Sequence, residues 1–330
     1  MGFGVNESAQ AVGGAQTTDA NSEDFCGFNS YGFPPSSTTC LPFLWHYGVM
    51  QALPTLGGPN GYANMINDRG DIAGVAETPI QDAGCSVHRF QPVVWKNGEP
   101  HVLTTPDLYG VAAYINERGQ VVGASGSCAP FNANTLLYLN EVRAMFWEAN
   151  GQPHELPNLG GGGGIAGNHA CNVNNLGEAV GHSELTNNTA FHATLWPKVN
   201  KVIDLGTLDG DYGSLALGIN DSGIVVGASL DAAFNPRAVV WQHNILTDMN
   251  TLVADNSGLY LFLAESINNR GEIVGLGATN AGEVHGFQAI PIDKDGDFAP
   301  LTPLPRPTLS DSARERLRRE LARLHVDSPR

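Results

Sequence analysis

Residues 218–230 read GINDSGIVVGASL, and five closely similar segments occur elsewhere in the 330-residue chain. They are GVNESAQAVGGAQ (4–16), MINDRGDIAGVAE (65–77), YINERGQVVGASG (114–126), VNNLGEAVGHSE (173–184) and SINNRGEIVGLGA (266–278). The shared pattern is I-N-x-x-G-x-[IV]-V-G, and successive asparagines lie 61, 49, 58, 46 and 48 residues apart, starting from Asn6. Self-similarity at this spacing indicates a repeat architecture.

Each copy is typical of a tight β-hairpin. Apolar residues alternate before the Asn and after the Gly, so two strands flank a four-residue turn. Asn at the first turn position accepts backbone hydrogen bonds, and Gly at the last takes a positive φ, as in a type I turn with a bulge. The predicted turn residues are Asn67 and Gly70, Asn116 and Gly119, Asn174 and Gly177, Asn220 and Gly223, and Asn268 and Gly271. The first copy has Ala9 in place of the glycine, so we expect a looser turn there.

Two further apolar segments follow each hairpin. The first is FLW (43–45), VVW (93–95), MFW (145–147), TLW (194–196), VVW (239–241) and FQAI (287–290). The second is ALPTLGG (52–58), HVLTTPDL (101–108), ELPNLGG (155–161), IDLGTLDG (203–210), TDMNTLV (247–253) and FAPLTPL (298–304). Four short strands, here called a to d, in about 50 residues are the signature of a propeller blade. The predicted fold is therefore all-β, a six-bladed β-propeller of four-stranded blades over residues 1–304. An open solenoid is the alternative, but its coils are usually shorter and more uniform.

The amino-acid composition argues against two classes of partner, nucleic acid and anionic membranes. The formal charge is −16, and an acidic protein lacks the positive surface that nucleic acid or an anionic membrane needs. No apolar run reaches the ~18 residues of a membrane span. The opening residues lack the basic start and apolar core of a signal peptide. We expect a monomer.

The C-terminal segment differs in kind. Residues 305–330 contain a proline-bearing linker and a basic stretch in which Leu317, Leu321 and Leu324 fall at helical spacing. They predict a short basic amphipathic helix or a disordered tail. A short helix resting on the propeller, or a frayed tail, is favoured over a membrane-surface or partner helix.

The sequence of a hairpin, a strand ending in tryptophan and a D-L-G-T-L segment resembles the HAF-family extracellular repeat proteins of bacteria. The best-matching copy is Phe191-His192-Ala193-Thr194-Leu195-Trp196, followed by Asp204-Leu205-Gly206-Thr207-Leu208. The family histidine is present only at His192 and His285, with Arg143 and Arg237 at that position in two other copies. The resemblance covers about residues 1–304. It implies a repeat fold and an extracellular or periplasmic location, and it implies no known reaction.

Cysteine usage points to the same compartment. Four of the five cysteines lie in the connections between strands b and c, where Cys26 and Cys40 share one loop and Cys85 and Cys128 occupy the next two blades. Disulfides 26–40 and 85–128 are the economical pairing of three possible ones, and disulfides persist in oxidising compartments. Cys171 is expected to be a buried free thiol. Zinc binding is disfavoured because the chain has no C-x-x-C pair.

The connections between strands predict where a ligand would bind. The b–c connections of the first three repeats are long, about 15–41, 78–91 and 126–143, and long loops on a rigid fold often carry function. The d–a connections are rich in aromatic and acidic residues that would surround the mouth of the central channel and suit sugar rings. The candidate ligand-binding residues are Tyr62, Tyr109, His169, Asp209, Asp211, Tyr212 and Tyr260. The alternatives are drift in unused loops and tyrosines that simply pack between blades.

Signals for catalysis are weak. The chain has no G-x-S-x-G, H-E-x-x-H or Walker motif, and the glycine run 160–164 lacks the Lys-Ser/Thr of a phosphate loop. Asp293, Asp295 and Asp297 have the spacing of a calcium loop but lack its downstream Glu, so an acidic turn is the default and calcium the alternative. No other cofactor is expected.

Three functions remain open. The favoured hypothesis is a secreted, non-catalytic binding module for a glycan or cell-surface polymer. The alternatives are a polysaccharide hydrolase or lyase that uses acids, Tyr and His at the channel mouth, and a purely structural or adhesive repeat protein.

Overall fold

The strands form six antiparallel sheets, one for each repeat. The computed structural model describes residues 2–21, 23, 38–128, 139–162, 167–253, 258–279 and 281–291. The first three sheets are β1 (Gly2–Val5), β2 (Ala11–Ala20), β3 (Thr38–His46) and β4 (Val49–Ala52); β5 (Gly61–Ile66), β6 (Ile72–Glu77), β7 (Phe90–Lys96) and β8 (Glu99–Val102); and β9 (Tyr109–Ile115), β10 (Val121–Cys128), β11 (Leu139–Trp147) and β12 (Pro153–Glu155).

The last three sheets are β13 (His169–Val173), β14 (Ala179–Glu184), β15 (Phe191–Lys198) and β16 (Lys201–Gly206); β17 (Gly213–Ile219), β18 (Val225–Leu230), β19 (Pro236–Gln242) and β20 (Ile245–Asp248); and β21 (Leu259–Ile267), β22 (Ile273–Thr279) and β23 (Val284–Ala289). Two single-turn 3₁₀ helices, η2 (Thr186–Asn188) and η3 (Met249–Thr251), complete the described elements. None of the described helices is long and apolar enough to cross a bilayer.

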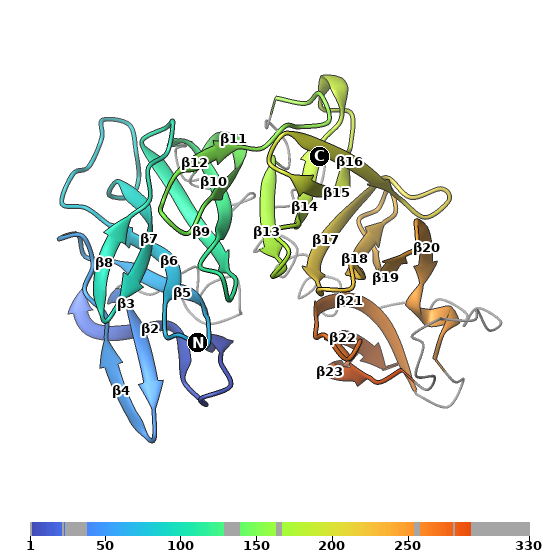
Figure 1. Ribbon diagram of the computed structural model, residues 1–330, viewed down its shortest axis with the longest axis horizontal. Helices are drawn as coiled ribbons and strands as arrows, with labels where there is room; N and C mark the ends of the chain where they lie inside the picture. Colours follow the sequence, from blue (N-terminus) through green and yellow to red (C-terminus); the bar gives the residue numbers. More distant parts are fainter. Residues whose placement is uncertain are drawn as a thin grey trace.

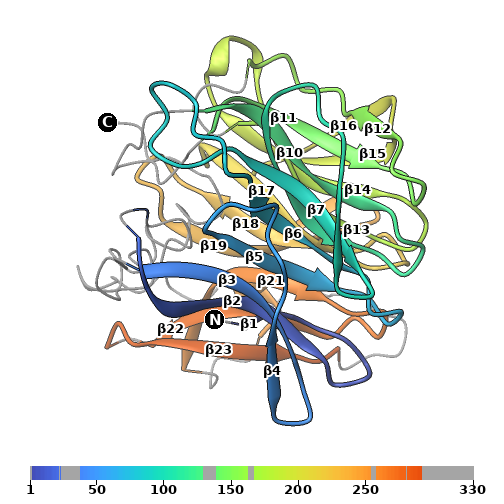
Figure 2. The same ribbon diagram turned by 90° about the vertical axis from the view of Figure 1, so that its left-hand side faces the viewer.

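The sheets follow one another around a common axis as the blades of a six-bladed β-propeller, which confirms the predicted fold (Figure 1). Seen from the side, the first three blades succeed each other in chain order (Figure 2). Apolar clusters fill the space between neighbouring blades, for example Val75, Phe90, Tyr109 and Val142 between the second and third. The predicted fourth strand of the last blade, 298–304, and the C-terminal segment 305–330 lie outside the described residues.

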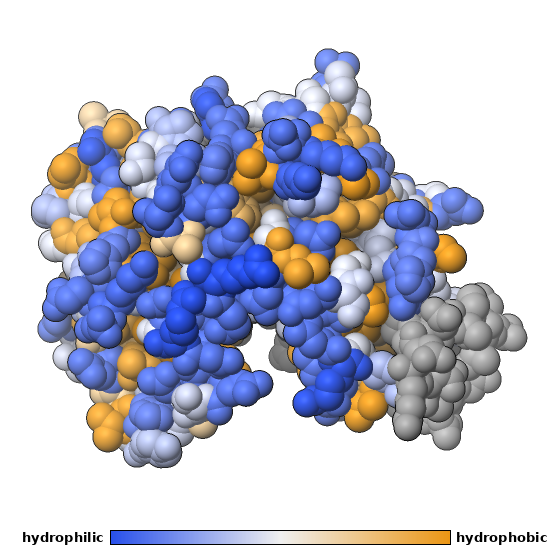
Figure 3. Space-filling view, viewed as in Figure 1, coloured by the Kyte–Doolittle hydropathy of each residue, from blue (hydrophilic) through white to orange (hydrophobic). Residues whose placement is uncertain are grey.

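The described strands of the first and last blades do not pack closely against each other. Among the described strands, no extensive packing joins β1–β4 to β21–β23. The space-filling view shows a notch between these two ends at its lower edge (Figure 3). At the a–b turns, the bond from Arg270 to Glu272 raises the pKa of Arg270, and the charge of Glu7 in the first blade raises it further.

The a–b turns have the geometry that the repeat motif predicts. In the second blade the Gly70 N–H donates to the Asn67 carbonyl and the Asn67 N–H donates to the Asp71 carbonyl, both at 3.0 Å. The Asn67 side chain also accepts bonds from the N–H groups of Arg69 and Asp71. The motif glycines lie at φ of +82°, +81°, +84°, +74° and +78° in blades two to six, at Gly70, Gly119, Gly177, Gly223 and Gly271.

The expectation of a looser first turn is wrong. Ala9 adopts a φ of +56°, and the turn keeps both hydrogen bonds, Ala9 N–H to the Asn6 carbonyl at 3.0 Å and Asn6 N–H to the Gln10 carbonyl at 3.1 Å. The surrounding bonds hold an alanine in a conformation that costs an L-residue about 1–2 kcal/mol.

Replacing Ala9 by glycine is therefore expected to stabilise the protein by about 1 kcal/mol, because glycine takes positive φ without steric cost. Gly70→Ala, the reverse change at the equivalent position of the second blade, should destabilise it by a similar amount. Urea unfolding of both variants measures the two effects, and equal signs would contradict the strain at Ala9.

A ladder of asparagine side chains joins the six turns. In the first five blades, the Nδ2 group of the motif asparagine donates to the backbone carbonyl of the motif asparagine in the next blade, at 2.8–3.1 Å. The ladder runs Asn6, Asn67, Asn116, Asn174, Asn220, Asn268. The motif asparagine thus has two functions: its oxygen closes its own turn and its nitrogen fixes the neighbouring blade.

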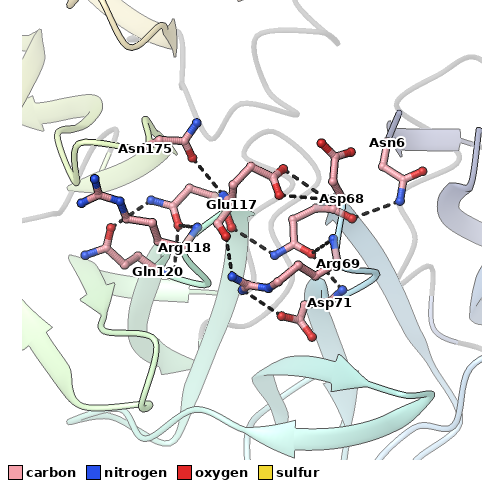
Figure 4. A network of polar contacts seen from close by, with 10 residues as sticks. Asn6, Asp68, Arg69, Asp71, Glu117, Arg118, Gln120 and Asn175 are labelled. Carbon is pink, nitrogen blue, oxygen red and sulfur yellow. Dashed lines mark hydrogen bonds and ion pairs between the residues drawn. The ribbon is translucent and has the colours of Figure 1, made fainter. Parts of the chain in front are cut away.

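The residue after each asparagine forms a second ladder beside the first (Figure 4). Its backbone N–H donates to the side-chain oxygen of the equivalent residue in the next blade, as from Asp68 to Glu117 and from Glu117 to Asn175. The complete series is Glu7, Asp68, Glu117, Asn175, Asp221 and Asn269. This explains why every repeat has Asp, Glu or Asn at that position.

The last glycine of the motif is required by a close backbone approach. Strand a carries a bulge in every blade, such as Leu217 between the paired residues Ala216 and Gly218, and strand a of the sixth blade carries two. Opposite the bulge, a Cβ atom on Gly227 would overlap the carbonyl oxygen of Leu215. The same overlap with a strand-a carbonyl arises at Gly74, Gly123, Gly181 and Gly275.

The repeated tryptophan links one blade to the preceding one. Trp95, Trp147, Trp196 and Trp241 are buried, and their indole N–H groups donate to the carbonyls of Pro54, Thr104, Pro157 and Leu205. These acceptors lie at or just after strand d of the blade before. Trp45 of the first blade has no preceding blade and is 38% exposed.

Strand d is shorter and earlier than the predicted segments. β4 ends at Ala52 and β8 at Val102, so most of ALPTLGG and HVLTTPDL forms the connection to the next blade. Proline and glycine end the ladder there, and Leu53 and Leu103 turn inward and are buried. The predicted b–c connections are also shortened, because β2 and β3 run to Ala20 and from Thr38.

Candidate functional site

The strand order gives the propeller two different faces. In an antiparallel a-b-c-d blade, the a–b and c–d turns lie at one end of the strands, here called the turn face. The b–c and d–a connections lie at the other end, here called the loop face. The c–d turns are tight, with paired positive φ values at Asn97-Gly98 and His243-Asn244. Variation in length between repeats is therefore concentrated on the loop face.

A disulfide joins two neighbouring blades on the loop face. Cys85 and Cys128 are bonded as predicted, with their Cα atoms 6.0 Å apart, and they link the b–c connection of the second blade to the end of β10 in the third. Cys40 is also disulfide-bonded, and its predicted partner Cys26 lies outside the described residues. Cys171 is a free thiol at the bulge of β13, and burial raises its pKa to about 12. An inert thiol fits these surroundings.

An ion pair holds the second b–c connection next to this disulfide. The Arg89 guanidinium donates to both oxygens of Asp82, from Nη2 at 2.7 Å and Nε at 3.0 Å. The Tyr109 hydroxyl donates to Asp82 Oδ2 at 2.7 Å. The bonds from Arg89 and Tyr109 lower the pKa of Asp82, and burial is the main cause of the raised Tyr109 pKa. These bonds hold the connection against β9 of the third blade.

The predicted aromatic residues lie at equivalent places on the loop face, at or beside the start of strand a. Tyr109, His169 and Tyr260 are buried there. Tyr109 packs edge-on against Phe90, and His169 stacks on His182 with ring centroids 6.0 Å apart. These side chains pack between blades. Tyr62 and Tyr212 are partly exposed, so the aromatic surface that a ligand could reach is smaller than the predicted set.

The two predicted aspartates differ from each other. Asp211 accepts from the Ser229 hydroxyl at 2.7 Å and pairs with Arg237 at 2.7 Å, so it holds the fifth blade together. Asp209 is exposed beside the partly exposed Tyr212. The predicted calcium ligands Asp293, Asp295 and Asp297 lie outside the described residues.

Residues at the position of the HAF-repeat histidine form ion pairs between strands c and d of their own blade. His192 Nδ1 lies 2.9 Å from Asp204 Oδ1, which joins strands c and d of the fourth blade. Arg143 and Arg237 occupy the same position and face Glu155 and Asp248 of their own strand d. These contacts are structural.

Sequence reasoning missed a buried polar cluster on the loop face. Glu23 follows β2, Glu77 ends β6, and His88 lies in the b–c connection of the second blade. One ligand atom from each residue falls within 4.8 Å of the others. His88 Nδ1 is 2.8 Å from Glu23 Oε1. This group can hold a cation, and we call it the carboxylate–histidine cluster.

Asn60 orients the two carboxylates of this cluster. Its Nδ2 group donates to Glu23 Oε2 and to Glu77 Oε2, both at 2.9 Å, and its backbone N–H donates to Glu77 Oε2 at 3.0 Å. Its Oδ1 accepts from the Cys40 N–H at 3.0 Å. Removal from water, and then the nearby charge of Glu23, raises the pKa of Glu77 to about 9.

Aligning the repeats would have revealed part of this cluster. Glu77 and Glu184 both end strand b, and Asn60 and Asn168 both precede strand a in their blades. In the fourth blade the Gly167 N–H donates to Glu184 Oε1 at 3.2 Å, and Asn168 accepts from Ser183. Acids that recur where the other copies have neutral residues are a usable signal.

No protein-family model matches the sequence, and no curated protein matches it significantly. Among solved structures, a gluconolactonase from Xanthomonas campestris is 8% identical, with a TM-score of 0.37 over 72% of this chain and 75% of that one. An acylaminoacyl peptidase from Pyrococcus horikoshii is 12% identical, with a TM-score of 0.49 over 88% of this chain and 45% of that longer one. At these identities and TM-scores the likeness carries no information about activity.

Proposed function

We propose that this propeller is a secreted binding module that takes a glycan or cell-surface polymer on its loop face. The observation that carries the proposal is the cross-link between the b–c connection of blade two and the end of strand b in blade three. The Cys85–Cys128 bond and the Asp82–Arg89 pair fix these segments in advance. Fixed segments lower the ordering cost of binding.

The ligand class follows from the side chains that remain accessible on this face. Tyr62 and Tyr212 are partly exposed although their rings also contact Phe3 and Phe234, respectively, and Asp209 is exposed. Aromatic faces stack on sugar rings, and carboxylates accept hydroxyl hydrogen bonds. The disulfide and the resemblance to HAF-family repeats support secretion.

A polysaccharide panel tests the proposal. Binding is measured by calorimetry, and the same samples are analysed for new reducing or unsaturated ends. We expect binding without new ends, weakened about tenfold or more by Tyr212→Ala, Tyr62→Ala or Asp209→Ala.

The matched control is Leu176→Ala, which removes an exposed apolar side chain from a turn-face hairpin. It should leave affinity unchanged. If this variant loses binding while the loop-face variants keep it, the ligand binds on the turn face and the proposal is wrong. If new reducing or unsaturated ends appear, the protein is a polysaccharide hydrolase or lyase and not a non-catalytic binding module.

A further inference from the structure

The carboxylate–histidine cluster contains one acceptor that no described group satisfies. Glu77 is fully buried, and its Oε1 atom has no hydrogen-bond partner, while Oε2 takes both bonds from Asn60. A buried carboxylate oxygen without a partner is costly. Its side chain points toward Glu23 and His88, whose ligand atoms complete the group.

Among the described residues of this cluster, one basic side chain accompanies two carboxylates. Asn60 is neutral, and His88 is the one basic side chain among the three grouped residues. Two buried carboxylates side by side repel each other unless a proton or a cation lies between them. A divalent cation would neutralise both and give Glu77 Oε1 a partner.

The donor set selects the kind of cation. Two carboxylates and one imidazole nitrogen are the ligands that first-row divalent metals such as Zn²⁺ and Mn²⁺ accept. Calcium requires six to eight oxygens, which this cluster does not supply. Asn60 would be the supporting residue, since it holds one oxygen of each carboxylate and is itself fixed by the Cys40 N–H.

We propose that Glu23, Glu77 and His88 bind a divalent transition-metal ion that joins the end of the first blade's strand b to the second blade. The site is independent of the proposed polymer, because its ligands are buried or half-buried beneath the loop face. Its function is to fix the segment that follows β2 against β6 and the connection before β7.

The fourth blade provides an internal comparison. Glu184 is the equivalent of Glu77 and is equally buried, but a backbone N–H of Gly167 binds its carboxylate. Among the described residues, the only group of three or more ligands with this convergence is the one around Glu77. Glu184→Gln therefore controls for the loss of a buried acid at the same repeat position.

The full chain is treated with a chelator, dialysed, and titrated with Zn²⁺ or Mn²⁺ by calorimetry, with the melting temperature recorded at each step. Wild type should bind one equivalent and melt higher when loaded. Glu77→Gln and His88→Gln should weaken binding by about 100-fold or more and lose the metal-dependent rise. Glu184→Gln should keep both.

Circular dichroism of each metal-free variant shows whether it is folded, so loss of binding is not confused with loss of structure. If Glu77→Gln does not fold, the test of metal binding rests on His88→Gln, which changes only a half-buried side chain. Wild type that binds neither metal overturns the proposal and leaves a shared proton between the carboxylates. Unchanged binding in folded Glu77→Gln and His88→Gln overturns it as well.

Discussion

Double replacement of Cys85 and Cys128 by serine is expected to lower the free energy of unfolding by about 4 kcal/mol. The bond closes a loop with a sequence separation of 43 residues, and the chain-entropy model gives that value for such a loop. The loop includes all of β7, β8 and β9, so its closure restricts the unfolded chain across two blades. Guanidinium unfolding under non-reducing conditions measures the loss.

Cys171→Ala is the matched control, because it removes a thiol that forms no disulfide. Mass mapping without reductant should link Cys85 to Cys128, link Cys26 to Cys40 and leave Cys171 unmodified. Wild type that has five free thiols after oxidative preparation, or a double variant as stable as wild type, would contradict both the cross-link and the secretion argument.

Gly227→Ala should destabilise the protein by about 3 kcal/mol, more than any substitution of a turn glycine. A methyl group at this position overlaps the Leu215 carbonyl across the strand-a bulge, and neither backbone can move without breaking the sheet. Gly223→Ala in the same hairpin meets no atom within 4 Å and has only its φ of +74° as a penalty, about 1 kcal/mol.

Thermal and urea unfolding of the two glycine variants separate these causes. Gly223→Val, with a β-branched side chain at the same turn position, should lose about 1 kcal/mol or more. If Gly227→Ala costs no more than Gly223→Ala, the close approach is wrong and positive φ is the main constraint of the motif.

The sequence predicts the blades because its motif residues act locally. The Asn–Gly pair closes a turn within five residues, and the hairpin follows from that chemistry in every copy. The functions of Asn67 toward Asn116 and of Trp95 toward Pro54 join different blades, so they become visible only with the arrangement of the blades. Strand d was predicted too far along the chain, because leucine residues continue the apolar pattern after the strand has ended.

The site was harder to predict for a related reason. Tyr109 and Asp211 are residue types that are common in sugar-binding sites. In the structure, however, Tyr109 is bonded to Asp82 and Asp211 is paired with Arg237, both from other segments of the chain. Glu23 and Glu77 are 54 positions apart in the sequence, and although Glu77 ends a repeat copy, Glu23 lies outside every copy of the motif. Only tertiary packing brings them together, and a single chain without its fold contains no measure of that distance.

The asparagine ladder makes the architecture suitable for grafting. Its bonds stay at 2.8–3.1 Å although the repeats they join differ from 46 to 61 residues in length. The longest connections lie at the opposite ends of the strands, between β2 and β3 and between β10 and β11. Foreign recognition loops inserted between strands b and c would be held by blades whose positions the asparagine ladder fixes on the opposite face. Hypervariable loops are held in the same way by an antibody domain.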